Sequence, residues 1–245
     1  MEENKESQSR FSLKRASTWE RLTQAENQQL MDYALGYKEF LDQGKTEREC
    51  IDYIVERAQA AGFVNLDSAI AAGQRLKPGD RVYAVNRHKG AILAVIGTEP
   101  LEQGLNILGS HVDSPRLDLK PNPLYEAEKM AWLKTHYYGG IKKYQWLTLP
   151  LALHGVVFTG KGEKVRLVIG ESPEDPVFTV PDLLPHLAKD QMEKKLREAV
   201  SGEGLNLLVG SIPVKDEKVK ERIKEQVLTY LNAKYGMIEE DFLTA

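Results

Sequence analysis

The chain has 245 residues and a mass of 27.6 kDa, which is long enough to bury the core of one large or two small domains. A formal net charge of −3 and an isoelectric point near 6.0 argue against a nucleic-acid-binding protein. Cys50 is the only cysteine, which excludes an internal disulfide and a cysteine-based zinc site within one chain. Neither a signal peptide nor an apolar stretch of membrane-spanning length is found, so we expect a soluble, cytoplasmic protein without a membrane partner.

Two capping motifs predict two helices near the start of the chain. Ser17 to Glu20 has the spacing of a capping box, so the first helix is expected from Trp19 to about Asp42. Its apolar residues recur at helical spacing: Leu22, Leu30, Tyr33, Ala34, Tyr37 and Leu41. Thr46 to Glu49 repeats the capping motif, and the second helix is expected to end near Ala61, where Gly62 follows.

A first group of short apolar runs predicts strands after these helices. They lie at residues 81–85, 91–96 and 105–110, and they include runs that are apolar throughout. Strands of this kind are buried on both sides. Two helices followed by such strands therefore indicate an α/β domain whose sheet is covered on both faces.

The character of the sequence changes after Pro115, and we place a domain boundary near residue 118. Pro121 and Pro123 are expected to interrupt the chain. Further strands are predicted at residues 131–138, 151–158, 164–169 and 177–180. Apolar residues at helical spacing predict a helix over residues 218–235, so the second domain is β-rich with one long helix.

The clearest candidate for chemistry lies at the end of the predicted strand 105–110. His111 follows this strand and Asp113 comes two residues later, so both side chains are expected on one face. Asp113 could then hold one ring nitrogen of His111 and leave the other for a metal. The alternative is a buried histidine that a neighbouring carboxylate satisfies. The strand-end position favours a site, because open α/β sheets bind ligands beyond the carboxyl ends of their strands.

The remaining histidines have plainer interpretations when taken alone. His186 fits a half-buried polar residue at the start of a helix. His136 and His154 lie in apolar β surroundings and are expected to be structural, while His88 lies in a predicted hairpin loop at residues 86–90. The chain has no Gly-x-Ser-x-Gly elbow, P-loop or dinucleotide fingerprint, which disfavours nucleophile and nucleotide chemistry.

Three blocks taken together resemble the M18 metalloaminopeptidases, the aspartyl aminopeptidase family. Residues 109–120 are similar to the family's Ser-His-x-Asp-Ser-Pro signature with its trailing lysine. Tyr137 to Ile141, followed by residues 149–157, is similar to its Tyr-Gly-Gly block and the strand after it. Pro181 to Ala188 is similar to its Ile-Pro-x-Leu-Ala segment. The resemblance covers the chain from about residue 18.

The resemblance implies a catalytic α/β domain of the dizinc-peptidase type, incomplete in this sequence, with an inserted β-rich dimerisation domain. On this basis we expect residues 1–118 to belong to the catalytic domain and residues 119–236 to the insert. Residues 237–245 would lead back toward the catalytic domain. The partners implied are peptide substrates and further copies of the chain.

The resemblance also implies roles for three residues. His111 would be a ligand of one metal, Asp113 the carboxylate that orients it, and His186 a histidine that reaches a partner subunit's active site and contacts substrate. The cofactor would be Zn²⁺, two ions in the complete enzyme, with Co²⁺ or Mn²⁺ as alternatives. The reaction would be metal-assisted hydrolysis of the N-terminal peptide bond.

The family's other metal ligands lie downstream of the matching region, so we expect a truncated chain that is inactive by itself. Glu239 and Glu240 resemble the family's Glu-Glu pair but come too early, and we expect them on the surface. Residues 142–150 depart from the family sequence after the glycines, so a preference for acidic residues is not implied. The alternatives are a non-catalytic dimerising or regulatory fragment, a decayed gene product, or a single-metal hydrolase of another kind.

Overall fold

A computed structural model of the protein describes residues 11, 13 and 15–243, and the chain divides into two compact units, residues 1–44 and 45–245. The first unit contains a 3-10 turn, η1 (Thr18–Glu20), and helix α1 (Gln24–Gln43). The capping box of α1 joins Thr23 and Glu26: the Thr23 hydroxyl accepts from the Glu26 N–H, and the Glu26 carboxylate accepts from the Thr23 N–H. The start predicted at Trp19 is wrong, because Ser17 makes no side-chain capping hydrogen bond and the turn after it stays short.

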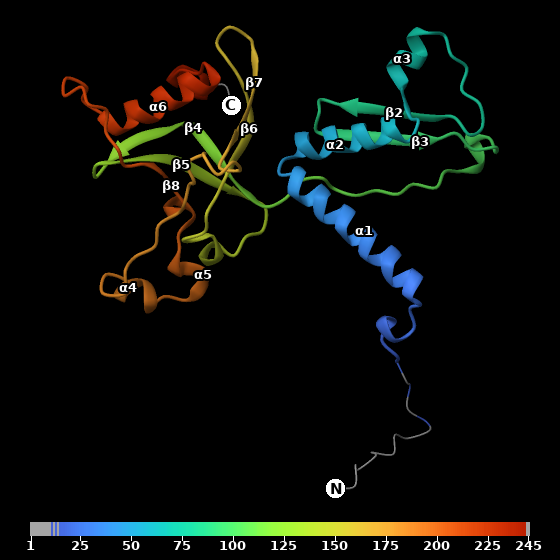
Figure 1. Ribbon diagram of the computed structural model, residues 1–245, viewed down its shortest axis with the longest axis horizontal. Coiled ribbons are helices and arrows are strands. Elements are labelled where there is room, and N and C mark those ends of the chain that lie inside the picture. Colours follow the sequence, from blue (N-terminus) through green and yellow to red (C-terminus); the bar gives the residue numbers. More distant parts are fainter. Residues whose placement is uncertain (1–10, 12, 14, 244–245) are drawn as a thin grey trace. The chain divides into compact units, whose positions relative to one another are not determined.

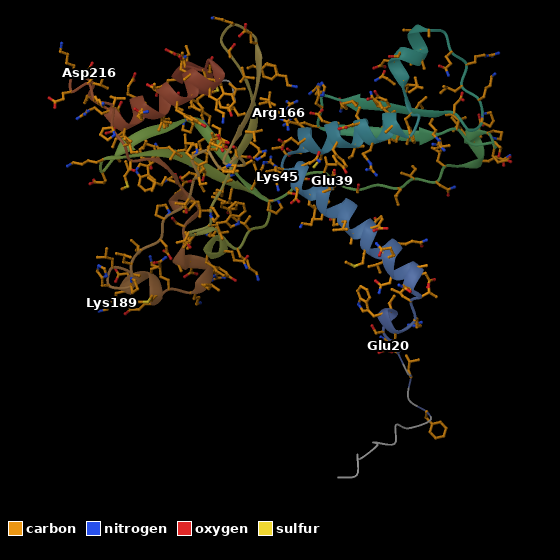
Figure 2. All side chains as sticks on the ribbon, in the orientation of Figure 1. Glu20, Glu39, Lys45, Arg166, Lys189 and Asp216 are labelled. Atoms are coloured by element: carbon orange, nitrogen blue, oxygen red, sulfur yellow. The ribbon has the colours of Figure 1, made fainter. Side chains whose placement is uncertain are left out.

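Helix α1 buries none of its residues. Its side chains project all round the helix in Figure 2, where Glu39 is labelled. The apolar stripe expected on this helix therefore has no packing partner within residues 15–44. Tyr33 is 80% exposed.

The second unit begins with helix α2 (Glu47–Ala60), and here the predicted capping box is confirmed. The Thr46 hydroxyl accepts from the Glu49 N–H, and a Glu49 carboxylate oxygen accepts from the Thr46 N–H. The helix ends before Gly62, whose φ of +82° belongs to the left-handed region that glycine adopts without strain. Cys50, Ile51 and Ala58 are buried.

A three-stranded sheet in the order β1-β2-β3 follows α2. Its elements are β1 (Val64–Asn65), α3 (Leu66–Ala71), β2 (Arg81–Asn86) and β3 (Gly90–Val95). β1 and β2 are parallel, whereas β2 and β3 form an antiparallel hairpin, which confirms two predicted strands and the loop that carries His88. Helix α2 packs on this hairpin (Figure 1). Ile92 is 73% and Val95 61% exposed, so the prediction of a sheet covered on both faces is wrong within the described chain.

The predicted strand at residues 105–110 is not formed. After η2 (Leu101–Gln103), residues 105–115 belong to no helix or strand. Ile107 is 83% exposed and Leu108 is fully exposed. A strand requires a neighbour for its N–H and C=O groups, and no described strand pairs with this segment. The apolar run of residues 105–110 indicated burial, but an apolar sequence does not by itself provide a neighbouring strand for pairing.

A second sheet has the order β4-β5-β8 and is antiparallel throughout. Its strands are β4 (Arg116–Ala127), β5 (Met130–Tyr138) and β8 (Leu207–Gly210). Pro121 and Pro123 lie inside β4 rather than interrupting it, because the register shifts between Leu119 and Leu124. Residue 118, the predicted boundary, lies within this strand, and the domain limits stay a prediction.

Helix α6 (Arg222–Tyr235) packs across this sheet (Figure 1), and it starts four residues later than the predicted helix. The hairpin of β6 (Leu153–Phe158) and β7 (Lys164–Ile169) confirms two further strands. The strand expected at residues 177–180 is reduced to isolated bridges, including one between Leu151 and Phe178. The short helices are η3 (Lys143–Trp146), α4 (Lys189–Met192), α5 (Leu196–Ala199), η4 (Gly202–Gly204) and η5 (Glu239–Leu243).

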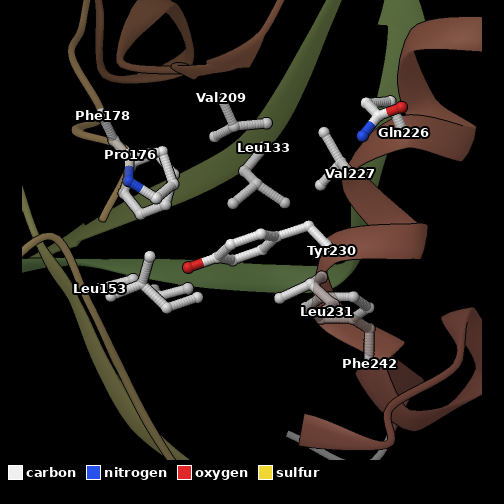
Figure 3. A pocket seen from close by; sticks show the side chains of 11 residues that line it. Leu133, Leu153, Pro176, Phe178, Val209, Gln226, Val227, Tyr230, Leu231 and Phe242 are labelled. Carbon is white, nitrogen blue, oxygen red and sulfur yellow. The ribbon is translucent and has the colours of Figure 1, made fainter. Parts of the chain in front are cut away.

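The core of the second unit consists of two hydrophobic clusters, and α6 contributes buried residues to both. One cluster packs around Leu133, Leu205 and Ile223, and the other around Ile169 and Leu231. A cavity of about 190 Å³ remains between α6 and the strands, with apolar side chains facing it (Figure 3). No helix of the described residues is long and apolar enough to cross a membrane.

Candidate functional site

His111 and Asp113 lie in the irregular segment that precedes β4, and their side chains meet there. His111 Nδ1 is 2.9 Å from the backbone carbonyl oxygen of Asp113 and 3.2 Å from its carboxylate oxygen Oδ1. Both neighbours are acceptors, so the arrangement requires the proton on Nδ1 and leaves a lone pair on Nε2. The side chain of His111 is 83% exposed. The expected pairing is therefore present, although the strand from which it was inferred is absent.

Tyr138, the last residue of β5, contacts the other oxygen of the same carboxylate. Its hydroxyl donates to Asp113 Oδ2 over 3.0 Å. This hydrogen bond, with smaller contributions from the Asp113 backbone N–H and from His111, lowers the pKa of Asp113 below its ordinary 3.8. The same contact raises the pKa of the Tyr138 hydroxyl. Asp113 is thus held as a carboxylate between His111 and Tyr138.

Arg116, the first residue of β4, lies over the ring of Tyr138. Its guanidinium carbon is 4.1 Å from the ring centroid. Its Nε is 2.7 Å from Asp118 Oδ1, and its Nη1 is 3.0 Å from Glu47 Oε1 in the first turn of α2. The site therefore draws on α2, β4 and β5 as well as on the segment that carries His111.

His186 is not brought to this site within the chain. It lies exposed in a turn just before α4, where the sequence predicted a half-buried side chain. The difference arises because its apolar neighbours Leu183, Leu184 and Leu187 are each more than half exposed and give it no cover. Among the described residues, no hydrogen bond or ion pair joins His186 to His111 or Asp113. Its proposed role in catalysis stays a prediction.

The donor groups at the site suit one metal ligand rather than a complete metal shell. Within residues 11, 13 and 15–243, no group of three or more His, Cys, Asp or Glu side chains is placed to hold an ion. His111 offers Nε2, and Asp113 is engaged with its other ring nitrogen. Glu239 and Glu240 are exposed as expected, and Glu239 pairs with Lys224 over 2.6 Å.

Sequence reasoning missed the contributions of Tyr138, Arg116 and Glu47. Tyr138 and Arg116 lie inside blocks that carry the family resemblance, but nothing local indicates that their side chains meet. They are direct partners in the register of β4 and β5. A correct prediction of this strand pairing was the one clue that could have placed them side by side.

Comparison with known proteins agrees with the resemblance. Residues 40–245 match the family described as "Aminopeptidase I zinc metalloprotease (M18)". The chain is 53% identical over 215 residues to "Probable M18 family aminopeptidase 1" of Clostridium acetobutylicum, covering 87% of this chain and 46% of that protein.

Solved structures give the same result. The crystal structure of an M18 family aminopeptidase from Thermotoga maritima matches with a TM-score of 0.84 and 43% identity, covering 95% of this chain and 49% of that one. The mApe1 dodecamer of S. cerevisiae matches with a TM-score of 0.57 and 19% identity over 87% of this chain and 47% of that one, which is a likeness of fold alone. The chain spans about half the length of the curated relatives it matches.

Proposed function

Because the chain belongs to the M18 family of zinc metalloproteases, we propose that it contributes a metal ligand to an aminopeptidase that removes N-terminal residues from peptides. The observation that carries this proposal is the pairing of His111 with Asp113. It places a proton on Nδ1 and leaves Nε2 exposed with a free lone pair. An imidazole in this state is the commonest protein ligand for zinc.

His111 would hold a zinc ion whose chemistry, when bound, would be to lower the pKa of a water molecule and to polarise the scissile carbonyl of the peptide. The role of this chain's other residues at the site is to hold His111, the proposed metal ligand, in place. Asp113 accepts from the Nδ1 side of His111, which fixes the ring tautomer and increases its basicity. Since no group of three or more ligating side chains is found among the described residues, we expect no hydrolysis by these 245 residues alone.

We further propose that His186 acts at the site of a second copy of the chain, through contacts of the region 119–236. The support is its position on an exposed turn among apolar side chains that are themselves exposed. Such a patch is typical of an interface between protein chains. The alternative function, a non-catalytic dimerising or regulatory fragment, is favoured by the same patch and by the absence of a group of three or more ligating side chains in the described chain.

A titration with Co²⁺ or Zn²⁺ followed by NMR tests the assignment of His111. We expect weak binding that perturbs His111 Nε2 and is lost in His111→Ala. His88→Ala is the matched control, because His88 is also an exposed loop histidine but lies in the β2–β3 hairpin. Binding that survives His111→Ala would contradict the assignment. Tight binding of one ion per chain would contradict the view that the ligand set is incomplete.

The peptidase activity itself is tested in a fusion. The 245 residues replace the corresponding part of the Clostridium acetobutylicum relative, whose remaining length they do not match. With zinc, the fusion is expected to release N-terminal residues from peptides, and its His111→Ala variant is expected to be inactive. A fusion that folds, binds zinc and hydrolyses no peptide would favour the non-catalytic alternative. Hydrolysis by the unfused chain would overturn the expectation that it is inactive alone.

A further inference from the structure

We propose that Tyr138 is a positioning residue for the metal ligand: its hydroxyl, held in place beneath the Arg116 guanidinium, fixes the Asp113 carboxylate and thereby the tautomer of His111. The proposal rests on the function proposed above, because it assigns His111 as a ligand. It adds a residue of β5 to the site and gives it a specific role.

The segment that carries His111 depends on side chains for its position. Residues 105–115 pair with no described strand, so no ladder of backbone hydrogen bonds holds them. The hydroxyl of Tyr138 ties the segment to β5 through Asp113 Oδ2, at 3.0 Å. Arg116 ties its carboxyl end to α2 through Glu47. The orientation of the His111 side chain therefore depends on the contacts that hold Asp113 in place.

The ring of Tyr138 has little freedom to move. Tyr138 and Arg116 are directly opposite one another in the antiparallel pair of β4 and β5. The guanidinium lies 4.1 Å from the ring centroid, within the range of a cation–π contact. Asp118 and Glu47 each hold a different nitrogen of the same guanidinium, which keeps it over the ring. A ring fixed in this way presents its hydroxyl at one place.

The Asp113 carboxylate is then held at both oxygens. Oδ2 accepts from Tyr138, so rotation of the carboxylate would break that hydrogen bond, and Oδ1 is left facing His111 Nδ1 at 3.2 Å. Without the hydroxyl, the Asp113 side chain, which is 40% exposed, can turn toward water. The Nδ1 proton of His111 would then keep only the backbone carbonyl oxygen of Asp113, at 2.9 Å, as its acceptor. The tautomer with a proton on Nε2, which cannot bind a metal through that nitrogen, should become more populated.

Tyr138→Phe in the 245-residue chain tests this chain of contacts, because it removes the hydroxyl and keeps the ring under Arg116. The readout is the tautomer of His111 in ¹H–¹⁵N correlation spectra of the ring, without metal, at a pH well above the ordinary histidine range. The wild-type chain is expected to show the Nδ1–H form. Tyr138→Phe is expected to lose this preference and show a mixture of both forms.

Tyr137→Phe is the matched control. Tyr137 is the neighbouring residue of β5; alternation along the strand directs its side chain to the opposite face from Tyr138, and its ring lies next to Gly202. It should leave the His111 spectrum unchanged. Asp113→Ala removes the carboxylate and is expected to reproduce the effect of Tyr138→Phe, so the test does not depend on the folding of one variant. A wild-type spectrum in Tyr138→Phe, or an equal change in Tyr137→Phe, would overturn the proposal.

Metal binding separates this inference from the proposed function. Loss of the hydrogen-bond partner of a ligating histidine weakens metal binding by roughly 10-fold to 100-fold, so Tyr138→Phe, which only loosens that partner, should bind Co²⁺ up to about tenfold more weakly than the wild-type chain. If the tautomer changes but His111 binds no metal in any variant, the proposed function fails and the positioning role stands. If His111 binds metal and neither tautomer nor affinity changes in Tyr138→Phe, the positioning role fails alone.

Discussion

Glu49 Oε1 lies 3.0 Å from His154 Nδ1, although 105 residues separate the two along the chain. Arg166 Nη2 is 3.1 Å from the same oxygen, and Figure 2 labels this arginine on β7. The second oxygen of Glu49 accepts from the Thr46 N–H at the start of α2. One carboxylate therefore caps α2 and binds it to the β6–β7 hairpin. His154 is structural, as predicted, but its neighbours are charged rather than apolar, since Glu171 is 2.9 Å from its other ring nitrogen.

This arrangement predicts a loss of stability in acid. Burial opposes the ionisation of Glu49, but hydrogen bonds from His154, Arg166 and Thr46 and the charge of His154 outweigh it and lower its pKa below the ordinary 4.5. A carboxyl with a lowered folded-state pKa contributes stability that is present above its unfolded pKa and is lost as the pH falls through the folded value. The urea midpoint of the chain should therefore decline as the pH is lowered below about 4.5.

Glu49→Gln isolates the charge, because glutamine also serves in a capping box. At neutral pH we expect the variant to be less stable by about 1–3 kcal/mol, since His154 and Arg166 lose a charged acceptor. Its urea midpoint should decline less steeply in acid than that of the wild-type chain. Glu56→Gln, an exposed position of the same helix, is the control. Parallel pH curves for Glu49→Gln and the wild type would contradict the prediction.

The cavity beside α6 predicts that added volume stabilises the chain. Val209 and Leu133 line this cavity, and both face it in Figure 3. Val209→Ile adds one methylene group, worth up to about 0.8 kcal/mol when it is buried. It should raise the urea midpoint. Val95→Ile on β3 makes the same change at a side chain that is 61% exposed and should have no effect. A lower midpoint in Val209→Ile would mean that the cavity cannot accept the group.

The glycine at the end of α6 predicts a loss of stability on substitution that arises from backbone strain alone. Gly236 has a φ of +69°, and its N–H bonds to the Asn232 carbonyl oxygen over 2.8 Å. A Cβ atom at this position would meet nothing within 4 Å. Gly236→Ala should therefore lower the free energy of unfolding by about 1 kcal/mol through backbone strain, and Gly236→Asn by less. Equal stability of the alanine variant and the wild type would show that the αL conformation is not required.

The exposed segment before His111 predicts self-association of the chain. Leu105, Ile107 and Leu108 form a run of apolar side chains that are 68%, 83% and 102% exposed. Leu108→Asp should reduce association in sedimentation velocity without lowering the urea midpoint, because the side chain has no packing to lose. Met192→Asp adds the same charge at an exposed position of α4 and should change association less. A chain that is monomeric without any substitution would contradict the prediction.

The sequence could predict those parts of the fold that short segments decide by themselves. The capping box of Thr46 and Glu49 and the hairpin loop at residues 86–90 depend on residues a few positions apart, and both are observed. The same holds for His111 and Asp113, whose side chains meet across two residues whether or not a strand surrounds them. Local geometry was sufficient in each case because the two partners lie within a few residues of each other in the sequence.

The tertiary structure decided the rest. A strand needs a neighbouring strand and a side chain needs a contact partner, and a short segment of sequence indicates neither when the partner lies far away along the chain. Residues 105–110 are apolar enough for a strand, but no described strand pairs with them. β4 continues past Pro121 and Pro123 because its pairing with β5 resumes at Leu124 after a shift of register. The sequence by itself determined that His111 is paired with Asp113. Only the register of β4 and β5 brings Arg116 and Tyr138 together and sets Tyr138 against that carboxylate.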